Sequence, residues 1–244
     1  PRSPGSTLKP FVYALAFDDG LAHPETLIED RPVAFGPWRP QNFDRSFRGT
    51  VPVRQALSLS LNIPVVSLTE ALGPERLLSS LRKAGAKVLL PSDAPPGLAV
   101  SLGGVGMSLQ DLVQAYAALA RLGRPLRLSA EAGKAGPRDG ALFGPVAAWQ
   151  VVEILSRIPP PPGAAPNRIA FKTGTSYGHR DALALGFDGA HVAGVWMGRA
   201  DGTPVPGAFG GELAAPVLFE LFDRIGAARA PLPPPPPATL ILPN

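Results

Sequence analysis

Apolar and polar positions divide the chain into a helical first part and a later part of short strands. Over residues 7–17 apolar side chains recur at intervals of three and four, with few charges between them, which predicts a helix buried on most of its sides. Residues 18–50 are rich in Pro, Gly, Asp and Arg and keep no lasting period, so we expect a loop there. A long irregular stretch is therefore expected after the first helix.

The middle of the chain predicts further helices. Residues 53–72 are interpreted as two helical pieces divided at 60–62, because Ile63 precedes Pro64 and a residue before proline disfavours the helical conformation. Proline or serine at the start and glycine at the end delimit the segments that follow. Helices are expected over residues 73–85, 107–123 and 145–158 and, near the end of the chain, over 211–226.

The spacing of apolar residues changes late in the chain. Residues 168–176, 181–189 and 191–199 are short, partly alternating segments separated by turns, which is typical of adjacent antiparallel strands. No internal repeat is present. Helices first and strands late indicate an α+β fold, with a helical region and an antiparallel sheet.

Composition and charge narrow the function. Apolar residues make up 45% of the chain and charged residues 17%, which is ordinary for a folded protein. The excess of 23 basic over 19 acidic residues, +4, suits an anionic small substrate better than nucleic acid, and no basic–aromatic interleaving indicates nucleic-acid binding. The chain has no cysteine, and its histidines lack metal-ligand spacing, so we expect no zinc–thiolate site, metal or cofactor.

Prolines gather in two places among the 31 in the chain. Residues 159–166 are interpreted as an exposed loop and 231–244 as a stiff polyproline stretch. We expect one folded domain over residues 1–229 and a Pro-rich linker over 230–244 that leads to a further region. The chain has no initiator methionine, so we also expect segments before residue 1.

Ser6 and Lys9 form the first motif with candidate chemistry. Residues three apart on a helix share a face, so the hydroxyl and the amine can come within hydrogen-bond reach. Burial lowers the pKa of a lysine, and the neutral amine can then accept the serine proton. Ser6 as a plain helix N-cap is an equal alternative on spacing alone. The similar pair Ser80 and Lys83, late in an amphipathic helix, is interpreted as part of a solvated face.

Ser60 and Asn62 form the second motif. Alternate residues of an extended turn point the same way, so the hydroxyl and the carboxamide would both face a cleft. Taken alone, the pair is better explained as a polar cap for a helix that begins at Pro64.

The third motif runs from Lys172 to Thr175 on a predicted strand. Alternation places Lys172 and Gly174 on one side and the two threonines, Thr173 and Thr175, on the other. A glycine within a strand is unusual unless a ligand or another backbone approaches closely. The alternative is an edge-strand lysine followed by a bulge glycine.

The three motifs, in this order and in these settings, resemble the signature of the penicilloyl-serine transferases. Much of the chain is also similar to the transpeptidase domain of the bifunctional (class A) penicillin-binding proteins, through "PGSTLKPFVYALA", "RQALSLSLNIPVV", "SLGGVGMSLQDLVQAYAALARLG" and "KTGTSYGHRDALALGF". The form "KTGTSYG-x-RDA", followed by "VWMGRADGTPVPGAFG", most resembles the 1C-type subfamily.

The resemblance implies a catalytic role for five residues, which are Ser6, Lys9, Ser60, Asn62 and Lys172. Ser6 would attack the carbonyl between the two terminal D-alanines of a peptidoglycan stem peptide, and Lys9 would take its proton. Ser60 would relay a proton to the leaving D-alanine, while Asn62 would hold substrate amides and Lys9. The enzyme would then be a serine-type D-Ala-D-Ala transpeptidase that β-lactam antibiotics acylate.

In the third motif the resemblance assigns substrate binding to Thr173, Gly174 and Thr175, beside the catalytic Lys172. Lys172 would add positive potential, and Thr173 and Thr175 would hydrogen-bond the substrate carboxylate beside Gly174. The backbone N–H groups of Ser6 and Thr175 would form the oxyanion hole.

Two alternatives within this chemistry stay open. A serine β-lactamase shares the serine–lysine centre but must deacylate with water, for which its class A members use an additional glutamate. No Glu-x-x-x-Asn stretch between Asn62 and Lys172 would supply it. A non-catalytic penicillin-binding sensor domain is the second alternative.

The resemblance further implies what surrounds the chain. The family's sheet includes strands before the nucleophile helix, for which the residues before Ser6 leave no room. We therefore expect a transpeptidase fold without its N-terminal strands, with a sheet of roughly three strands and one face of the Ser6 helix uncovered. The parent protein would carry a glycosyltransferase domain and a membrane anchor, and would act on the periplasmic face of the bacterial inner membrane.

Overall fold

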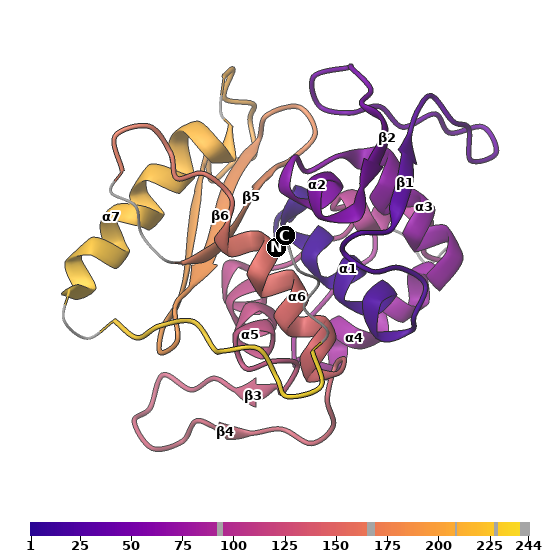
Figure 1. Cartoon of the computed structure of the whole chain (residues 1–244). Coiled ribbons are helices and arrows are strands. Elements are labelled where there is room, and N and C mark those ends of the chain that lie inside the picture. The colour runs from indigo at the N-terminus through magenta and orange to yellow at the C-terminus, as the bar shows by residue number, and fades with distance from the viewer. Residues whose placement is uncertain (92–94, 165–168, 208, 227–228, 240–244) are drawn as a thin grey trace.

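A helical part and an antiparallel sheet lie side by side in this protein (Figure 1). The computed structural model describes residues 1–91, 95–164, 169–207, 209–226 and 229–239. The helices are α1 (Lys9–Asp18), α2 (Val53–Ser58), α3 (Asn62–Leu72), α4 (Pro74–Lys83), α5 (Leu109–Ala120), α6 (Pro145–Ser156) and α7 (Ala215–Ile225), with short helical turns η1 (Gly5–Leu8), η2 (Leu98–Leu102) and η3 (Gly210–Ala214). The strands are β1 (Leu27–Asp30), β2 (Gly49–Pro52), β3 (Leu126–Arg127), β4 (Gly136–Pro137), β5 (Ala170–Thr175), β6 (Asp181–Phe187) and β7 (Val192–Gly198). The α+β prediction is confirmed.

Helix α1 is the centre of the core. Every side chain from Lys9 to Phe17 is buried, as its nearly continuous apolar sequence predicts, and α1 contacts α3 on one side and α6 on the other. From α5, the Tyr116 hydroxyl donates a hydrogen bond to the Thr7 carbonyl at 2.8 Å, and its ring meets Phe11 edge-on at 5.4 Å. The expectation that one face of this helix is uncovered is wrong, because helices surround it.

Three antiparallel strands in the order β5–β6–β7 form the main sheet. Lys172 of β5 pairs with Leu185 of β6, and Leu183 of β6 pairs with Trp196 of β7. All residues of β6 are buried, because α5 packs on the sheet as well as α7 and η3. The predicted strands are confirmed, and β5 lies in contact with η1.

A two-stranded hairpin lies within the stretch predicted to be a loop. Strands β1 and β2 pair from Leu27 opposite Pro52 to Asp30 opposite Gly49. Each strand has only four residues, and both are partly exposed, so neither produces a readable alternation. The loop prediction for residues 18–50 is therefore wrong at both of these strands.

Helix α3 begins earlier than Pro64. The predicted break between the two helical pieces is present, but α3 starts at Asn62 and includes Ile63. Pro64 then lies in the first turn, where its missing N–H costs the helix no hydrogen bond. The local preference before proline was outweighed by burial of Ile63, which is 2% exposed.

The second serine–lysine pair does not form a solvated face. Ser80 is buried and its hydroxyl has no hydrogen-bond partner among the described residues, whereas Lys83 is exposed on α4. The interpretation of Ser80 as solvated is wrong. One side chain faces the core and the other faces solvent, so the two do not form a catalytic pair.

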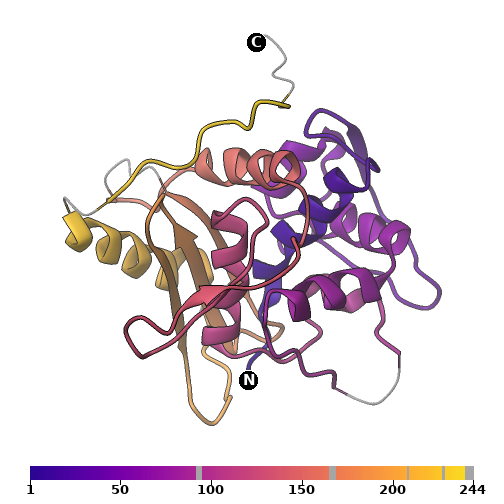
Figure 2. The same ribbon diagram turned by 90° about the horizontal axis from the view of Figure 1, so that it is seen from below.

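The chain after α7 turns back towards the domain. Residues 229–239 run across the molecule in the direction of α6 (Figure 2). Asp188, in the turn between β6 and β7, accepts a hydrogen bond from the Ala230 N–H at 3.4 Å, and Leu232 packs against the core. The first residues of the predicted linker thus contact the domain, and residues 240–244 lie outside the described residues. Within the described ranges, no helix has the length and apolar character to cross a membrane.

Candidate active site

At the candidate site, the backbone around Gly5 is in direct contact with the backbone at the end of β5. Gly5 has a φ of +53°, and a Cβ there would lie 2.6 Å from the Thr175 carbonyl oxygen. A Cβ on Gly174 would lie 2.6 Å from the Pro4 carbonyl oxygen. Both positions therefore require glycine. The sequence left open whether a ligand or another backbone approaches Gly174, and the structure shows that another backbone does, which sets Ser6 next to the end of β5.

Ser6 is not a helix cap. The cap position of η1 is Pro4 and that of α1 is Leu8, and neither end has a side-chain cap hydrogen bond. Ser6 is half-buried and lines a cavity that Ser60, Asn62 and the end of β5 also line. The N-cap interpretation of this serine is therefore wrong.

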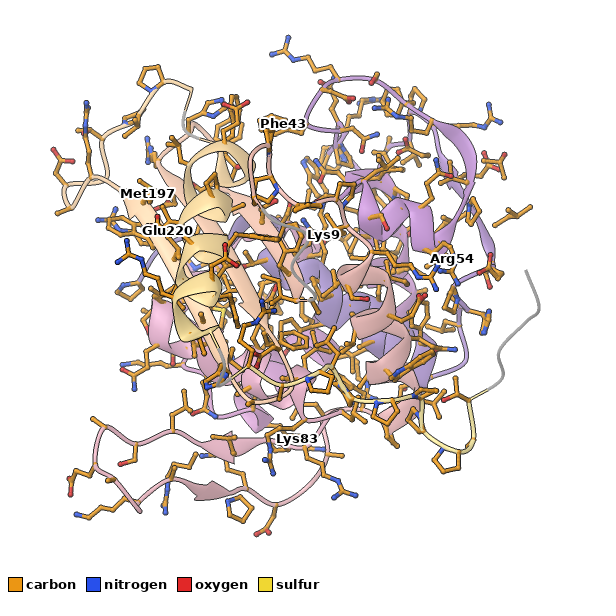
Figure 3. All side chains as sticks on the ribbon, turned by 60° about the vertical axis from the view of Figure 1, so that its left-hand side comes forward. Lys9, Phe43, Arg54, Lys83, Met197 and Glu220 are labelled. Atoms are coloured by element: carbon orange, nitrogen blue, oxygen red, sulfur yellow. The ribbon has the colours of Figure 1, made fainter. Side chains whose placement is uncertain are left out.

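Lys9 is fully buried, and its amine points at the turn between α2 and α3. The Nζ atom donates to the Ser60 carbonyl, to the Leu61 carbonyl at 3.1 Å and to Asn62 Oδ1 at 2.6 Å. It also lies 3.3 Å from Ser60 Oγ. Among the described contacts of Lys9 no hydrogen bond goes directly to Ser6. The structure thus joins the first motif to the second through Lys9. Figure 3 shows Lys9 in the interior between the helical part and the sheet.

The Ser60 turn has an unusual backbone. Ser60 has a φ of +57°, in the left-handed region that residues with a Cβ rarely adopt. Ser60 and Asn62 line the same cavity as Ser6. The residue at the cap of α3 is Leu61, without a side-chain cap bond, so the interpretation of the motif as a polar cap is wrong.

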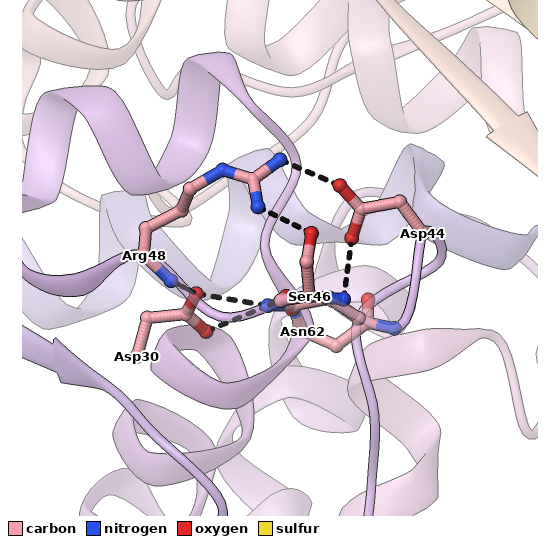
Figure 4. A network of polar contacts seen from close by, with 6 residues as sticks. Asp30, Asp44, Ser46, Arg48 and Asn62 are labelled. Carbon is pink, nitrogen blue, oxygen red and sulfur yellow. Dashed lines mark hydrogen bonds and ion pairs between the residues drawn. The ribbon is translucent and has the colours of Figure 1, made fainter.

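A buried polar network holds Asn62 in place (Figure 4). The Asn62 N–H donates to Asn42 Oδ1 at 2.7 Å, and its Nδ2 donates to the Gln41 carbonyl at 2.6 Å. Asn42 Nδ2 in turn donates to both carboxylate oxygens of Asp30, each at 2.8 Å. The Arg48 N–H donates to Asp30 Oδ2 at 2.7 Å. These hydrogen bonds connect the β1–β2 hairpin to the turn that Lys9 contacts.

Sequence reasoning missed Asp30 and Asn42. Both lie in the stretch interpreted as a loop, yet Asp30 is fully buried and Asn42 is 4% exposed. A buried carboxylate is rare unless it is paired or hydrogen-bonded. Nothing in the local pattern distinguishes these two residues from the exposed polar residues around them.

Two buried amines determine the electrostatics of the site. Burial is the largest effect that lowers the pKa of Lys9 well below its ordinary value, and the nearby charge of Lys172 lowers it further. The carboxylate of Asp30 acts in the opposite direction. Burial also lowers the pKa of Lys172 to about 7. A lysine with a lowered pKa has a neutral form that can accept a proton near neutral pH.

Strand β5 forms one wall of the cavity. Thr173 and Thr175 are partly exposed and line it together with Gly174, whereas the Lys172 side chain is buried and its Nζ donates to the Thr173 carbonyl at 2.9 Å. Thr175 Oγ1 accepts a hydrogen bond from the Gly210 N–H at 3.1 Å. As predicted, the Lys172 side chain lies on the opposite side of the strand from Thr173 and Thr175.

The cavity has a volume of about 1040 Å³ and lies between β5, the Ser60 turn and the loop 38–45. Three aromatic rings of its lining lie close together. The Phe43 ring centroid lies 5.2 Å from that of Phe209 and 6.0 Å from that of His179, and the last two are 4.9 Å apart. All three residues line the cavity. A peptide-sized ligand fits such a volume.

Curated relatives of the chain share its sequence over most of its length. It is 44% identical to penicillin-binding protein 1C of Escherichia coli (strain K12) over 240 residues, which are 95% of this chain and 30% of the relative. It is 31% identical to penicillin-binding protein 1B of Vibrio cholerae, over 83% of this chain and 29% of the relative. The chain thus spans about 30% of the length of these relatives.

Solved structures share the fold. The PonA1 protein of Mycobacterium tuberculosis, solved in complex with penicillin V, is 20% identical and matches with a TM-score of 0.76 over 96% of this chain and 76% of that one. Penicillin-binding protein 1A of Haemophilus influenzae is 18% identical, with a TM-score of 0.78 over 95% of this chain and 43% of that one.

The family follows from the sequence match, the fold and the order of the motifs together. A family profile described as the penicillin binding protein transpeptidase domain matches residues 1–200. The higher identity to the 1C protein than to the 1B protein agrees with the 1C-type resemblance of the sequence. The chain therefore belongs to the transpeptidase-domain family of the class A penicillin-binding proteins.

Proposed function

We propose that the chain is a serine D,D-transpeptidase domain that forms an acyl-enzyme on Ser6 from a peptidoglycan stem peptide ending in D-Ala-D-Ala. One observation carries this proposal. The buried amine of Lys9 contacts Ser60 and Asn62, and these two residues line one cavity together with Ser6 and with Thr175 of β5. A nucleophile, a base, a proton relay and a binding strand therefore share one site.

In the proposed acylation, neutral Lys9 takes the proton of Ser6 as Oγ attacks the carbonyl carbon between the two D-alanines. A C–O bond forms and a tetrahedral intermediate results. When it collapses, the C–N bond breaks, and the leaving amine of D-alanine receives its proton through Ser60. The contact of 3.3 Å between Lys9 Nζ and Ser60 Oγ supports this route, because it returns the proton taken from Ser6.

The binding roles rest on the contact between η1 and β5. The backbone N–H groups of Ser6 and Thr175 would stabilise the oxyanion, a contribution of about 3 kcal/mol per donor in other acyl-transfer enzymes. Thr173 and Thr175 would bind the terminal carboxylate from the exposed side of β5, with Lys172 buried behind them. The amine of a second stem peptide would then attack the acyl-enzyme and form the cross-link.

Reaction with a fluorescent penicillin tests the proposal. The protein should be labelled covalently, and Ser6→Ala should abolish labelling because no nucleophile remains. Ser80→Ala is the matched control, since Ser80 is buried, lies outside the cavity lining and has no hydrogen-bond partner in the part of the chain that the structure describes. Persistent labelling of the Ser6 variant would overturn the assignment.

The stability of the label separates this function from its alternatives. A β-lactam leaves no departing fragment, so the acyl-enzyme of a transpeptidase should persist for minutes or longer. Release within seconds would indicate a β-lactamase. Stable labelling without any release of D-alanine from a stem peptide would indicate a sensor domain.

We also propose that the whole protein resembles its longer relatives. The similarity to class A proteins, of which the chain spans about 30%, supports a glycosyltransferase domain elsewhere in the protein. It likewise supports a membrane anchor that holds this domain on the periplasmic face of the inner membrane. The flanking gene sequence and fractionation of the producing cells test both statements.

A further inference from the structure

Two arginines on the loop between β1 and β2 face the cavity without a partner. Arg39 and Arg45 are exposed and line the same cavity as Ser6. Among the residues that the structure describes, neither guanidinium group takes part in a hydrogen bond or an ion pair. An arginine carries five N–H donors and stays charged at every physiological pH, so each of these groups is available to an anion.

The acids of the β1–β2 hairpin and its loop, Glu29, Asp30 and Asp44, are already engaged with other groups. Asp44, next to Arg45 in the chain, bonds Arg48 at 2.5 Å and accepts the Ser46 N–H at 3.0 Å. Asp30 is occupied by the buried network that holds Asn62. Glu29 pairs with Arg31 at 2.5 Å. The carboxylates of the hairpin thus neutralise other groups and leave the two cavity arginines unpaired.

The backbone keeps one of these arginines in an unfavourable conformation. Arg45 has a φ of +59°, in the left-handed region, where a residue with a Cβ is uncommon. Its N–H donates to the Asn42 carbonyl at 3.0 Å, which ties the turn to the buried network. The position of Arg45 is therefore coupled to the same residues that hold Asn62.

Charges around the cavity favour an anion on this wall. The carboxylate that lines the cavity, Glu212, belongs to η3, which packs on β5 and β6. Arg39 and Arg45 come from the wall formed by the β1–β2 loop. The terminal carboxylate of the substrate is already assigned to Thr173 and Thr175, so the arginines are free for a different group.

We propose that Arg39 and Arg45 bind a second carboxylate of the peptide substrate, carried by an acidic residue upstream of the D-Ala-D-Ala terminus. The inference rests on the proposed transpeptidase function and adds a subsite to it. Guanidinium groups match the planar geometry of a carboxylate and bind it through paired hydrogen bonds. The two arginines thereby select acidic peptides over neutral ones.

Two matched peptides test the subsite. Both end in D-Ala-D-Ala and differ only in an upstream glutamate or glutamine, and kcat/KM is measured from the release of D-alanine. The protein should prefer the glutamate peptide about five- to tenfold at low salt, and less at high salt because both arginines are exposed. In the double variant Arg39→Gln/Arg45→Gln the ratio should fall to about one.

The control variant removes equal charge elsewhere. Arg124→Gln/Arg127→Gln takes away two exposed arginines that do not line the cavity, and its preference should equal that of the unmodified protein. Arg39→Lys/Arg45→Lys keeps the charge without the paired geometry and should retain only part of the preference. An equal preference in the double glutamine variant and the unmodified protein would overturn the inference, as would equal rates for both peptides in the unmodified protein.

Binding separates this inference from the proposed function. The Ser6→Ala variant cannot be acylated, so fluorescence anisotropy with labelled forms of the two peptides measures recognition alone. In the Ser6→Ala variant the glutamate peptide should bind more tightly than the glutamine peptide, and this difference should disappear when Arg39 and Arg45 are also replaced. That result supports the subsite even if the protein releases no D-alanine. Absence of penicillin labelling would instead refute the proposed function, whereas equal binding of both peptides would refute the subsite.

Discussion

Lys9 and Lys172 are two buried amines in one site, and the charge of Lys172 disfavours the charged form of Lys9. Asp30 is fully buried and acts on Lys9 in the opposite sense. These neighbours determine the pH range in which Lys9 is neutral, which is the form that its proposed role as the base requires. Two substitutions of opposite sign therefore test the assignment of the base.

The acid limb of the pH–rate profile for penicillin acylation should move in opposite directions in these two variants. Lys172→Gln removes a positive neighbour, which raises the pKa of Lys9 and shifts the limb to higher pH. Asp30→Asn removes a negative neighbour, which lowers that pKa and shifts the limb to lower pH. Second-order acylation rates measured from about pH 5 to about pH 10 give both shifts.

Matched controls carry the same charge changes outside the site. Lys83→Gln and Asp139→Asn alter exposed residues that do not line the cavity, and both should leave the limb where it is. A shift of the same sign in both site variants would rule out Lys9 as the titrating base. A thermal unfolding curve for each protein checks that Asp30→Asn has kept the fold.

At the scale of elements, the site depends on the contact between η1 and β5. A Cβ on Gly174 would also lie 2.7 Å from Thr7 Cγ2, so an added methyl group would clash both with Pro4 and with Thr7 of η1. The turn η1, which carries Ser6, and strand β5 would have to separate to admit the added methyl group. We therefore expect a substitution at Gly174 to disturb the geometry of the site more than it lowers the stability of the whole domain.

Gly174→Ala should destabilise the protein by about 1–3 kcal/mol, the usual cost of overpacking, and should slow acylation by more than about tenfold. Denaturant unfolding and penicillin labelling measure the two effects separately. Gly136→Ala is the control, because a Cβ there meets nothing within 4 Å. Equal acylation rates in the two variants would show that the backbone contact does not position Ser6.

At the scale of the whole molecule, a buried lysine makes stability depend on pH. The pKa of Lys172 is about 7 in the folded protein, against an ordinary value of 10.5. Between these two values the unfolded chain binds more protons than the folded protein, so the free energy of unfolding rises with pH. Below about pH 7 both states carry the proton, and the cost of burying the charge is then greatest.

Lys172→Met should flatten this part of the stability curve. The variant should gain stability on the order of a few kcal/mol below about pH 7, because no buried charge remains. Urea unfolding at a series of pH values measures the change. Lys83→Met, at an exposed position, should leave the curve unchanged, and a Lys172→Met curve as steep as that of the unmodified protein would contradict the prediction.

Much of the fold could be predicted from the sequence. Apolar residues recur at helical spacing in α1, and the segments of β5 to β7 are short, partly alternating and separated by turns. The close approach at Gly174 could also be predicted, since a glycine inside a strand often marks a place where another backbone comes near. The network of Asp30 and Asn42 could not, because strands of four residues leave no period. Burial of Ser80 was missed for a different reason, since a serine on an amphipathic helix is expected to be solvated until its packing is known.

The glycines at positions 5 and 174 have a consequence for how the enzyme can diversify. Because two backbones touch there, no side chain lies between them whose size mutation could adjust. Selection or engineering that alters substrate preference must therefore act on the other walls of the cavity, above all on the hairpin loop that carries Arg39 and Arg45. Small substitutions cannot be accommodated at the contact between η1 and β5, whereas the loop between β1 and β2 can accept them. Substitutions that change substrate specificity should therefore lie in that loop.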